Sequence, residues 1–292
     1  MNTTETSVAF GAPGIEPRWT SSAKEGLGTA YHTSCRVWFT LSHGIVNEIY
    51  YPCVDEPNTR DFQFLITDGE TFCHEEKRDL DHLLEYPERD CLFYRLTNSE
   101  PKGRYRLIKH ILADPHRSVV LMHTQLEVLD GTLRGKLRLY ALLAPHIARQ
   151  GAGNSGWCSE TGGHNLLHAE RTGVHLVMGC SEGFSRRSVG YVGASDGWQD
   201  LTNNFKMDWE FCAAGHGNIA LTGEIVTRAG SPLRLPLLLG RVVRARWRSC
   251  CNPWRNRSRL IARPTCASGN ARWSNRSQTS ASTPQTAVTC IG

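Results

Sequence analysis

Aromatic rings and carboxylates lie close together in one short stretch, GYVGASDGWQD, which spans residues 190–200. The residues in it that could do chemistry are Tyr191, Asp196, Trp198 and Asp200. An aromatic face packs against the C–H groups of a sugar while a carboxylate accepts hydrogen bonds from its hydroxyls, so the pattern indicates a carbohydrate contact. The alternative is structural: Trp198 would fill a seam of the fold and Asp196 would cap the Asp-Gly turn.

A second stretch combines the same residue types. Tyr50 and Tyr51 are followed, after a loop, by Arg60 and Asp61. Two rings and a carboxylate beside a guanidinium offer both packing and hydrogen bonding to a polyhydroxylated ligand. We therefore treat these four residues as a second candidate for contact with a glucan or oligosaccharide.

Neither stretch supplies a complete catalytic apparatus. Hydrolysis of a glycosidic bond needs a pair of carboxyl groups in defined roles. The acidic side chains are numerous, but solvated loops and buried salt links account for them, so no catalytic residue is assigned among Glu48, Asp55, Asp61, Asp68, Glu75, Glu76, Asp196, Asp200, Asp208 and Glu210. The twelve His show no metal-ligand spacing, so we expect no metal and no cofactor.

The cysteines and the N-terminal residues indicate the cellular compartment and the redox state of the protein. The chain has 11 Cys, and those in residues 1–230 form no C-x-x-C pair and lie mostly in apolar runs, as reduced Cys do. The opening MNTTETSVAFGAPGIEP has no positive n-region and no apolar core, unlike a signal peptide. No apolar run is long enough to span a membrane. We expect a reduced, cytoplasmic protein.

The elements that must position the candidates are short apolar runs. Runs rich in β-branched and aromatic residues are separated by Gly, Pro, Asn and Asp, which predicts strands and turns rather than helices. These runs are residues 37–39, 45–51, 62–66, 71–74, 91–96, 104–111, 119–126, 136–143, 166–169, 174–178, 207–211 and 218–225. Residues 151–163 and 183–197 are rich in Gly and polar residues, so we expect loops there. Turn signals at this spacing predict an all-β sandwich or barrel.

Charge divides the chain into two unlike parts. Residues 231–292 hold 11 Arg and no Lys, Asp or Glu, which leaves 22 Lys plus Arg against 28 Asp plus Glu in residues 1–230. The body is therefore mildly acidic, at about −6, and the tail carries +11. An acidic body argues against a nucleic-acid platform and fits a neutral ligand such as a glucan.

The tail keeps no periodic pattern beyond Leu239, and its composition predicts disorder. Arginines with interleaved Trp could form an arm for nucleic acid or an anionic membrane. The complete absence of acidic residues and lysines is stranger than such an arm requires, so we expect neither nucleic acid nor membrane as a partner.

Several ordered blocks resemble one known family. They are GLGTA, CRVWFTLSHGIVNEIYYP, VDEPNTRDFQFLITDGETF, GRYRLIKHILADPH, LRLYALLAPH, GYVGASDGWQDL, NFKMDWEF and GNIALTGEI. Together they resemble the opening of bacterial glucoamylases and glucodextranases of glycoside hydrolase family 15, over residues 11–225. In that family this part is an N-terminal β-sandwich, similar to the galactose mutarotase fold, and the catalytic glutamates belong to a helical (α/α)6 barrel that follows it.

Composition and turn spacing, together with the resemblance, predict three parts: an extended lead-in at residues 1–18, an antiparallel two-sheet sandwich at 19–230 and a disordered basic tail at 231–292. The sequence resembles part of a glucan 1,4-alpha-glucosidase, but the resemblance implies that the catalytic residues are absent from it. The partner that the resemblance implies is a helical barrel, normally in the same chain. A free-standing carbohydrate-binding or mutarotase-like sandwich is the alternative. That chemistry would need a His or carboxylate pair on a concave face, which the sequence does not place.

The abrupt end of the resemblance also predicts a frameshift. Residues 231–237, back-translated and read from one base earlier, can give Phe-Thr-Leu-Ala-Leu-Ala-Phe, an alternating strand. The same shift applied to residues 249–258 and 263–270 can give Val-Leu-Leu-Gln-Ser-Leu-Ala-Glu-Pro-Phe and Lys-Ala-Tyr-Val-Arg-Gln-Trp-Gln. Acidic residues, lysine and periodicity all return in that one frame.

Overall fold

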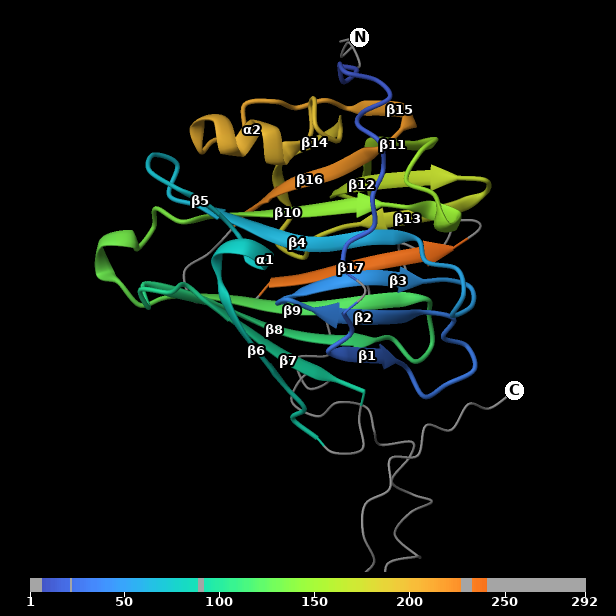
Figure 1. Cartoon of the computed structure of the whole chain (residues 1–292), viewed down its shortest axis with the longest axis horizontal. Coiled ribbons are helices and arrows are strands. Elements are labelled where there is room, and N and C mark those ends of the chain that lie inside the picture. The colour runs from blue at the N-terminus through green and yellow to red at the C-terminus, as the bar shows by residue number, and fades with distance from the viewer. Residues whose placement is uncertain (1–6, 22, 89–91, 227–232, 241–292) are drawn as a thin grey trace, which may run out of the picture.

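Two antiparallel sheets stacked face to face make up the fold (Figure 1), seen in a computed structural model that describes residues 7–21, 23–88, 92–226 and 233–240. The eight-stranded sheet has the order β1-β2-β3-β4-β10-β16-β14, and β5 pairs with β4. Its strands are β1 Gly26–Thr29, β2 Trp38–Ser42, β3 Ile45–Tyr50, β4 Thr59–Thr67, β5 Cys73–Glu75, β10 Arg138–Pro145, β14 Phe184–Tyr191 and β16 Ile219–Ile225.

The nine-stranded sheet has the order β15-β11-β12-β13-β17-β9-β8-β7-β6. Its strands are β6 Asp81–Glu85, β7 Tyr94–Ser99, β8 Tyr105–Ala113, β9 Val119–Val128, β11 Asn154–Thr161, β12 His164–Arg171, β13 Val174–Met178, β15 Ala213–Gly217 and β17 Leu233–Gly240. Short helices complete the described residues: α1 Glu76–Asp79, α2 Gly197–Asn204 and the 3-10 turns η1 Gly131–Leu133 and η2 Ile147–Arg149.

The core lies between the sheets and follows from strand alternation. In β4, Phe62, Phe64 and Ile66 point inward and are almost fully buried. The facing strands place alternate apolar residues against them, as in any two-sheet packing. The predicted all-β, antiparallel two-sheet sandwich is confirmed.

The sandwich extends further than the sequence indicated. Strand β17 covers residues 233–240, inside the tail that composition had assigned to disorder from residue 231. It pairs with β13 on one side and β9 on the other, and Leu233, Leu235, Leu237 and Leu239 are buried in the core. The alternation of buried Leu residues in LRLPLLLG explains why these residues form a strand, although the sequence around them is rich in arginine. The disorder and frameshift predictions for residues 241–292 lie outside the described residues.

Two expected loops are strands. Residues 154–161 form β11 and residues 184–191 form β14, although both stretches are rich in Gly and polar residues. Residues 207–211, expected to be a strand, have no regular structure. There the Asp200 carboxylate accepts the backbone N–H groups of Asp208 and Trp209, so this stretch bonds to a side chain instead of a strand.

The predicted lead-in is extended and packed against the body. We call residues 7–21 the N-terminal strap, which runs in front of the strands in Figure 1. The Ala9 N–H donates to the Ala213 carbonyl in the nine-stranded sheet, and the Ile15 N–H donates to the Val192 carbonyl beyond β14. The Trp19 ring then meets the His146 ring edge-on at 4.7 Å. The strap therefore joins the two sheets along one side of the molecule.

Candidate functional site

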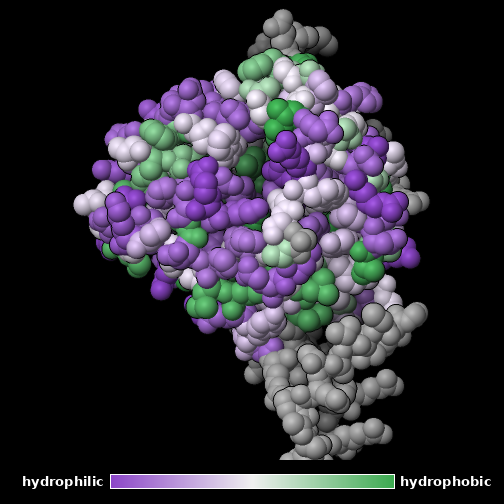
Figure 2. Space-filling view, in the orientation of Figure 1, coloured by the Kyte–Doolittle hydropathy of each residue, from purple (hydrophilic) through white to green (hydrophobic). Residues whose placement is uncertain are grey.

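The outer face of the eight-stranded sheet carries helix α2 and, with it, the candidates Asp196, Trp198 and Asp200. Helix α2 lies over this face and buries a second apolar cluster beneath it. That cluster consists of Leu65, Tyr140, Leu142, Leu201, Met207 and Ala220, with Trp198 at its margin. Figure 2 shows a mainly hydrophilic surface here, with a narrow recess in which apolar atoms are visible. The cluster itself is buried under helix α2, so Trp198 at its margin is the aromatic ring of this cluster that solvent reaches.

Asp196 starts helix α2 as its N-cap. Its carboxylate accepts the backbone N–H groups of Trp198 and Gln199 at 2.9 and 3.1 Å, and that of Gly193 as well. Burial raises the pKa of Asp196, and the three N–H donors and the charge of Arg60 act in the opposite direction. Asp is one of the strongest N-cap residues, so the sequence Asp-Gly-Trp dictates this helix start.

Tyr191 and Asp200 also have structural partners. The Tyr191 hydroxyl both donates to the Gly215 carbonyl and accepts its N–H, each at 2.9 Å. Burial raises the pKa of Asp200, whose carboxylate accepts two backbone N–H groups of residues 208 and 209. Both side chains are almost fully buried and bonded to backbone groups, so neither is exposed to contact a sugar.

Trp198 is half-buried and is fixed from a distant part of the chain. Its indole N–H donates to the Glu75 carboxylate at 3.2 Å, and the other oxygen of Glu75 accepts from the Gln63 amide at 2.8 Å. Arg78 lies 3.7 Å from the Glu75 carboxylate and 6.0 Å from the Trp198 ring centroid, which is a cation–π distance. The ring is thus held in one orientation, with polar groups around it.

Arg60 and Asp61 lie at the start of β4. Their side chains pair, with Nε of Arg60 3.0 Å from Oδ2 of Asp61. The Arg60 charge is a minor influence that lowers the pKa of the buried Asp196 carboxylate. Tyr50 and Tyr51 are half-buried where β3 leads into its loop, and burial raises the pKa of Tyr50. The backbone of both residues pairs with the loop that follows, Tyr50 with Pro57 and the Tyr51 N–H with the Glu56 carbonyl, and the Tyr51 side chain packs against the main core.

Sequence reasoning missed Gln63 and Arg78, and gave Glu75 no role at this site. Gln63 and Glu75 are 12 positions apart on paired strands, whereas Glu75 and Trp198 are 123 positions apart. The strand period could have placed Gln63 and Asp61 on one face. Nothing local in the sequence indicates that helix α2 lies over them.

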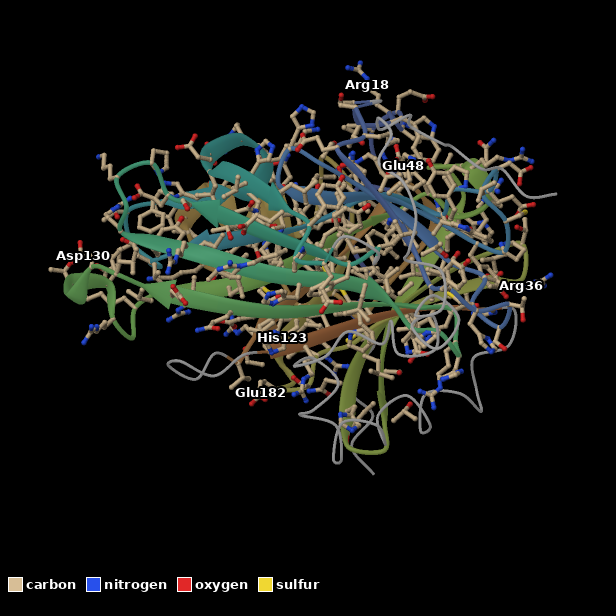
Figure 3. The ribbon with its side chains drawn as sticks, turned by 90° about the horizontal axis from the view of Figure 1, so that it is seen from below. Arg18, Arg36, Glu48, His123, Asp130 and Glu182 are labelled. Atoms are coloured by element: carbon tan, nitrogen blue, oxygen red, sulfur yellow. The ribbon has the colours of Figure 1, made fainter. Side chains whose placement is uncertain are left out.

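A pair of histidines lies on the opposite face. His110 and His123 are neighbours on β8 and β9 with ring centroids 5.9 Å apart, and Figure 3 shows His123 on the side away from Arg18 and Glu48. The mutarotase-like alternative would need such a pair as acid and base. Burial lowers the pKa of both rings, that of His123 to about 4, and the Phe93 ring stacks on His110. They are therefore packed, neutral rings at pH 7.

His146 is the buried imidazole beside the strap. Both of its ring nitrogens lack a hydrogen-bond partner among the described residues, and it is 1% exposed. Burial lowers its pKa to about 4, with a smaller effect from the Arg60 charge. An unfolded chain takes up a proton near pH 6.5, whereas the folded chain resists protonation until about pH 4. The stability that neutral His146 contributes is therefore complete above pH 6.5 and is lost as the pH falls toward 4.

We expect His146→Phe to reduce the acid sensitivity of folding. Between pH 7 and pH 4.5 the wild type should lose ~2 kcal/mol more of its unfolding free energy than the variant. Urea titrations at the two pH values measure this difference. His116→Phe, at an exposed position, is the matched control and should leave the pH dependence unchanged. Equal acid sensitivity in H146F and wild type would contradict the assignment.

Among the described residues, no group of three or more His, Cys, Asp or Glu is placed to hold a metal ion. No helix in that part of the chain is long and apolar enough to cross a membrane. The six cysteines for which a state is known, Cys35, Cys53, Cys73, Cys158, Cys180 and Cys212, are free thiols.

The fold defines a large antiparallel sandwich domain with an aromatic and carboxylate cluster on one outer face. The sequence profile described as Glucodextranase, domain N matches residues 9–245, so the chain belongs to that family. It is 34% identical over 232 residues to a glucoamylase of Clostridium sp. (strain G0005), covering 80% of this chain and 33% of that protein. A crystal structure of a bacterial glucoamylase complexed with acarbose superposes with a TM-score of 0.78 at 33% identity, covering 81% of this chain and 35% of that one.

The chain spans about a third of the length of these relatives. The matched part is the N-terminal sandwich, which the described residues build. The resemblance to glucoamylases and glucodextranases noted in the sequence is thereby confirmed.

Proposed function

We propose that this domain is the non-catalytic N-terminal part of a glucan hydrolase of glucoamylase type, and that its Trp198 face contacts the glucan. The relation to a glucoamylase at 34% identity supports the first statement. The observation that carries the second is the Trp198 ring, which is half-buried at the margin of the apolar cluster, has its indole N–H bonded to Glu75, and has the Arg78 guanidinium no closer than 6.0 Å to its centroid. Acarbose, the ligand in the related structure's name, is an oligosaccharide-like molecule, which agrees with a carbohydrate ligand.

The exposed apolar residues of the N-terminal strap support a second contact, in which another protein domain covers the strap. Val8, Phe10, Ile15 and Trp19 are 64%, 52%, 58% and 45% exposed. Phe10 also meets the Trp209 and Phe211 rings edge-on, which widens this apolar surface. Ordered residues that leave large apolar side chains in water indicate a surface that another body covers. The helical catalytic domain of full-length relatives is the partner we propose.

Replacing Trp198 by Ala tests the glucan contact. Calorimetry or NMR titration with maltooligosaccharides and isomaltooligosaccharides should show weak binding by the wild type, with one linkage preferred. Loss of an aromatic face is worth roughly 0.5–1.5 kcal/mol, so W198A should bind about 3- to 10-fold more weakly. Trp157→Ala, on the nine-stranded sheet, is the matched control. Unchanged affinity in folded W198A would refute this face as the binding site.

A further inference from the structure

Two thiols face each other at the edge of the nine-stranded sheet. Strands β11 and β15 pair with Trp157 opposite Ala213, and one further step along this register brings Cys158 opposite Cys212. The Cys158 N–H donates to the Cys212 carbonyl at 2.9 Å, which shows that the pairing continues to these residues. Both cysteines are free.

The backbone geometry places the two thiols within bonding reach. Side chains of directly opposite residues on antiparallel strands point to the same side of the sheet, with Cα atoms about 4.5–5.5 Å apart. A disulfide joins Cα atoms about 4.4–6.8 Å apart, so this pair needs no large backbone movement. The Cys158 and Cys212 side chains already interact, since the Cys212 thiol is one of the groups that raise the pKa of Cys158.

The two thiols differ in access. Cys212 is exposed, whereas Cys158 is half-buried with its Sγ 3.8 Å from the Phe211 carbonyl oxygen. Burial is the main reason that the pKa of Cys158 rises to about 12. Because the thiolate is the reacting form, an external oxidant should meet Cys212 first and Cys158 second.

We propose that Cys158 and Cys212 are a redox-modification site that forms a reversible cross-strand disulfide. The oxidant is the disulfide of a small thiol such as glutathione. The Cys212 thiolate attacks one of its sulfurs, forms a mixed disulfide and releases one small thiol. The Cys158 thiolate then attacks Sγ of Cys212 and releases the second small thiol. Two protein thiols lose two electrons and two protons, and the small disulfide gains them.

The disulfide would join β11 covalently to the chain just before β15, where hydrogen bonds hold the two together. The N-terminal strap is attached at the same point. The Cys212 N–H donates to the Ser7 carbonyl, and Phe211 meets Phe10 edge-on, so the N-terminal strap is attached at this point. The Cβ atoms of directly opposite residues are about 4.5–5.5 Å apart, slightly more than the 3.5–4.5 Å of a relaxed disulfide. Strained, accessible disulfides are the readily reduced kind, so reversibility is expected.

Titration of the full chain with oxidised and reduced glutathione, followed by peptide mapping by mass spectrometry, tests the proposal. The expected result is a peptide pair linked through Cys158 and Cys212, lost again on reduction. Oxidation should also slow proteolytic release of the strap in wild type. Mapping the unmodified chain avoids dependence on a variant that could misfold.

Cys212→Ser should abolish the linked peptide pair and leave Cys158 open to alkylation only under unfolding conditions. Cys53→Ser, at a half-buried position on another loop, is the matched control and should leave the pair intact. Cys212 that carries only a glutathione adduct, with Cys158 still reduced at every ratio tested, would overturn the proposal. So would preferential linkage of Cys212 to any other cysteine.

Discussion

The chain as written should release no glucose from maltooligosaccharides or isomaltooligosaccharides, and a gene returned to the adjacent reading frame after codon 230 should encode a protein that does. In the family that the sequence resembles, the acid and base belong to a helical barrel, which the described residues do not form because they build the sandwich. Loss of a catalytic pair removes an acceleration of at least ~10⁶-fold. Enzyme-coupled detection of glucose from both proteins, purified in parallel, measures the contrast.

Strand β17 gives this prediction a structural reason. Pro236 lies inside a strand that has neighbours on both sides, β13 and β9, and stands opposite Leu121. Proline cannot donate to a ladder and is normally confined to edge strands or bulges. The adjacent frame puts Ala at position 236 and keeps Leu at positions 233 and 235, which are core positions. Ala would therefore suit the ladder at position 236 better than Pro, while the family profile matches the written frame as far as residue 245.

Resequencing the gene decides whether the frame is real. A deletion or insertion near codon 230, followed by an open frame encoding helices, is the expected outcome. Stop codons throughout the adjacent frame would exclude it. So would a frame-restored protein that folds but releases no more glucose than the written chain. The matched control is a Pro236→Ala variant in the written frame, which should gain stability without gaining activity.

The sequence predicted this fold well where apolar residues alternate and poorly where glycine is required for packing. Strands β8, β9 and β10 have β-branched and Leu-rich alternation and were predicted at nearly their observed bounds. Strands β11 and β14 were interpreted as loops because of glycines. A Cβ at Gly190 would lie 1.9 Å from the Ser195 carbonyl oxygen, and one at Gly156 would lie 2.8 Å from Ile219. These glycines therefore allow neighbouring backbone and side chains to approach the strand more closely than a Cβ would permit.

The candidate site was predictable only in its local part. Asp196 and Trp198 are two positions apart, and the capping tendency of Asp in Asp-Gly is visible in the sequence. That Glu75 and Gln63 would hold the Trp198 indole depends on β4, β5 and α2 meeting in space. Contacts between residues more than a hundred positions apart leave no periodic signal in one sequence. The eight predicted residues accordingly contain the ring and its cap, and omit the residues that orient it.

The largest stability effect is expected at a buried ion pair between the two sheets. Glu76 on α1 and Lys109 on β8 are 0% and 1% exposed, with Nζ of Lys109 2.5 Å from Oε1 of Glu76. The Glu76 carboxylate also accepts from the Phe64 N–H and the Asn98 amide, and Lys109 donates to the Gly44 carbonyl. Burial raises the pKa of Glu76 and lowers that of Lys109, and their mutual attraction opposes both shifts.

Lys109→Met should destabilise the sandwich by about 3–5 kcal/mol, because it leaves the Glu76 carboxylate buried without its cation. In a domain of this size that corresponds to a fall in Tm of roughly 10 °C or more, measured by calorimetry or circular dichroism. Lys102→Met, at an exposed position, is the matched control and should shift Tm little. The double variant Glu76→Gln with Lys109→Met should recover part of the loss, since no charge is then left unpaired. If the single Lys109→Met variant were as stable as wild type, the pair would not be holding the two sheets together, and their apolar core alone would have to do so.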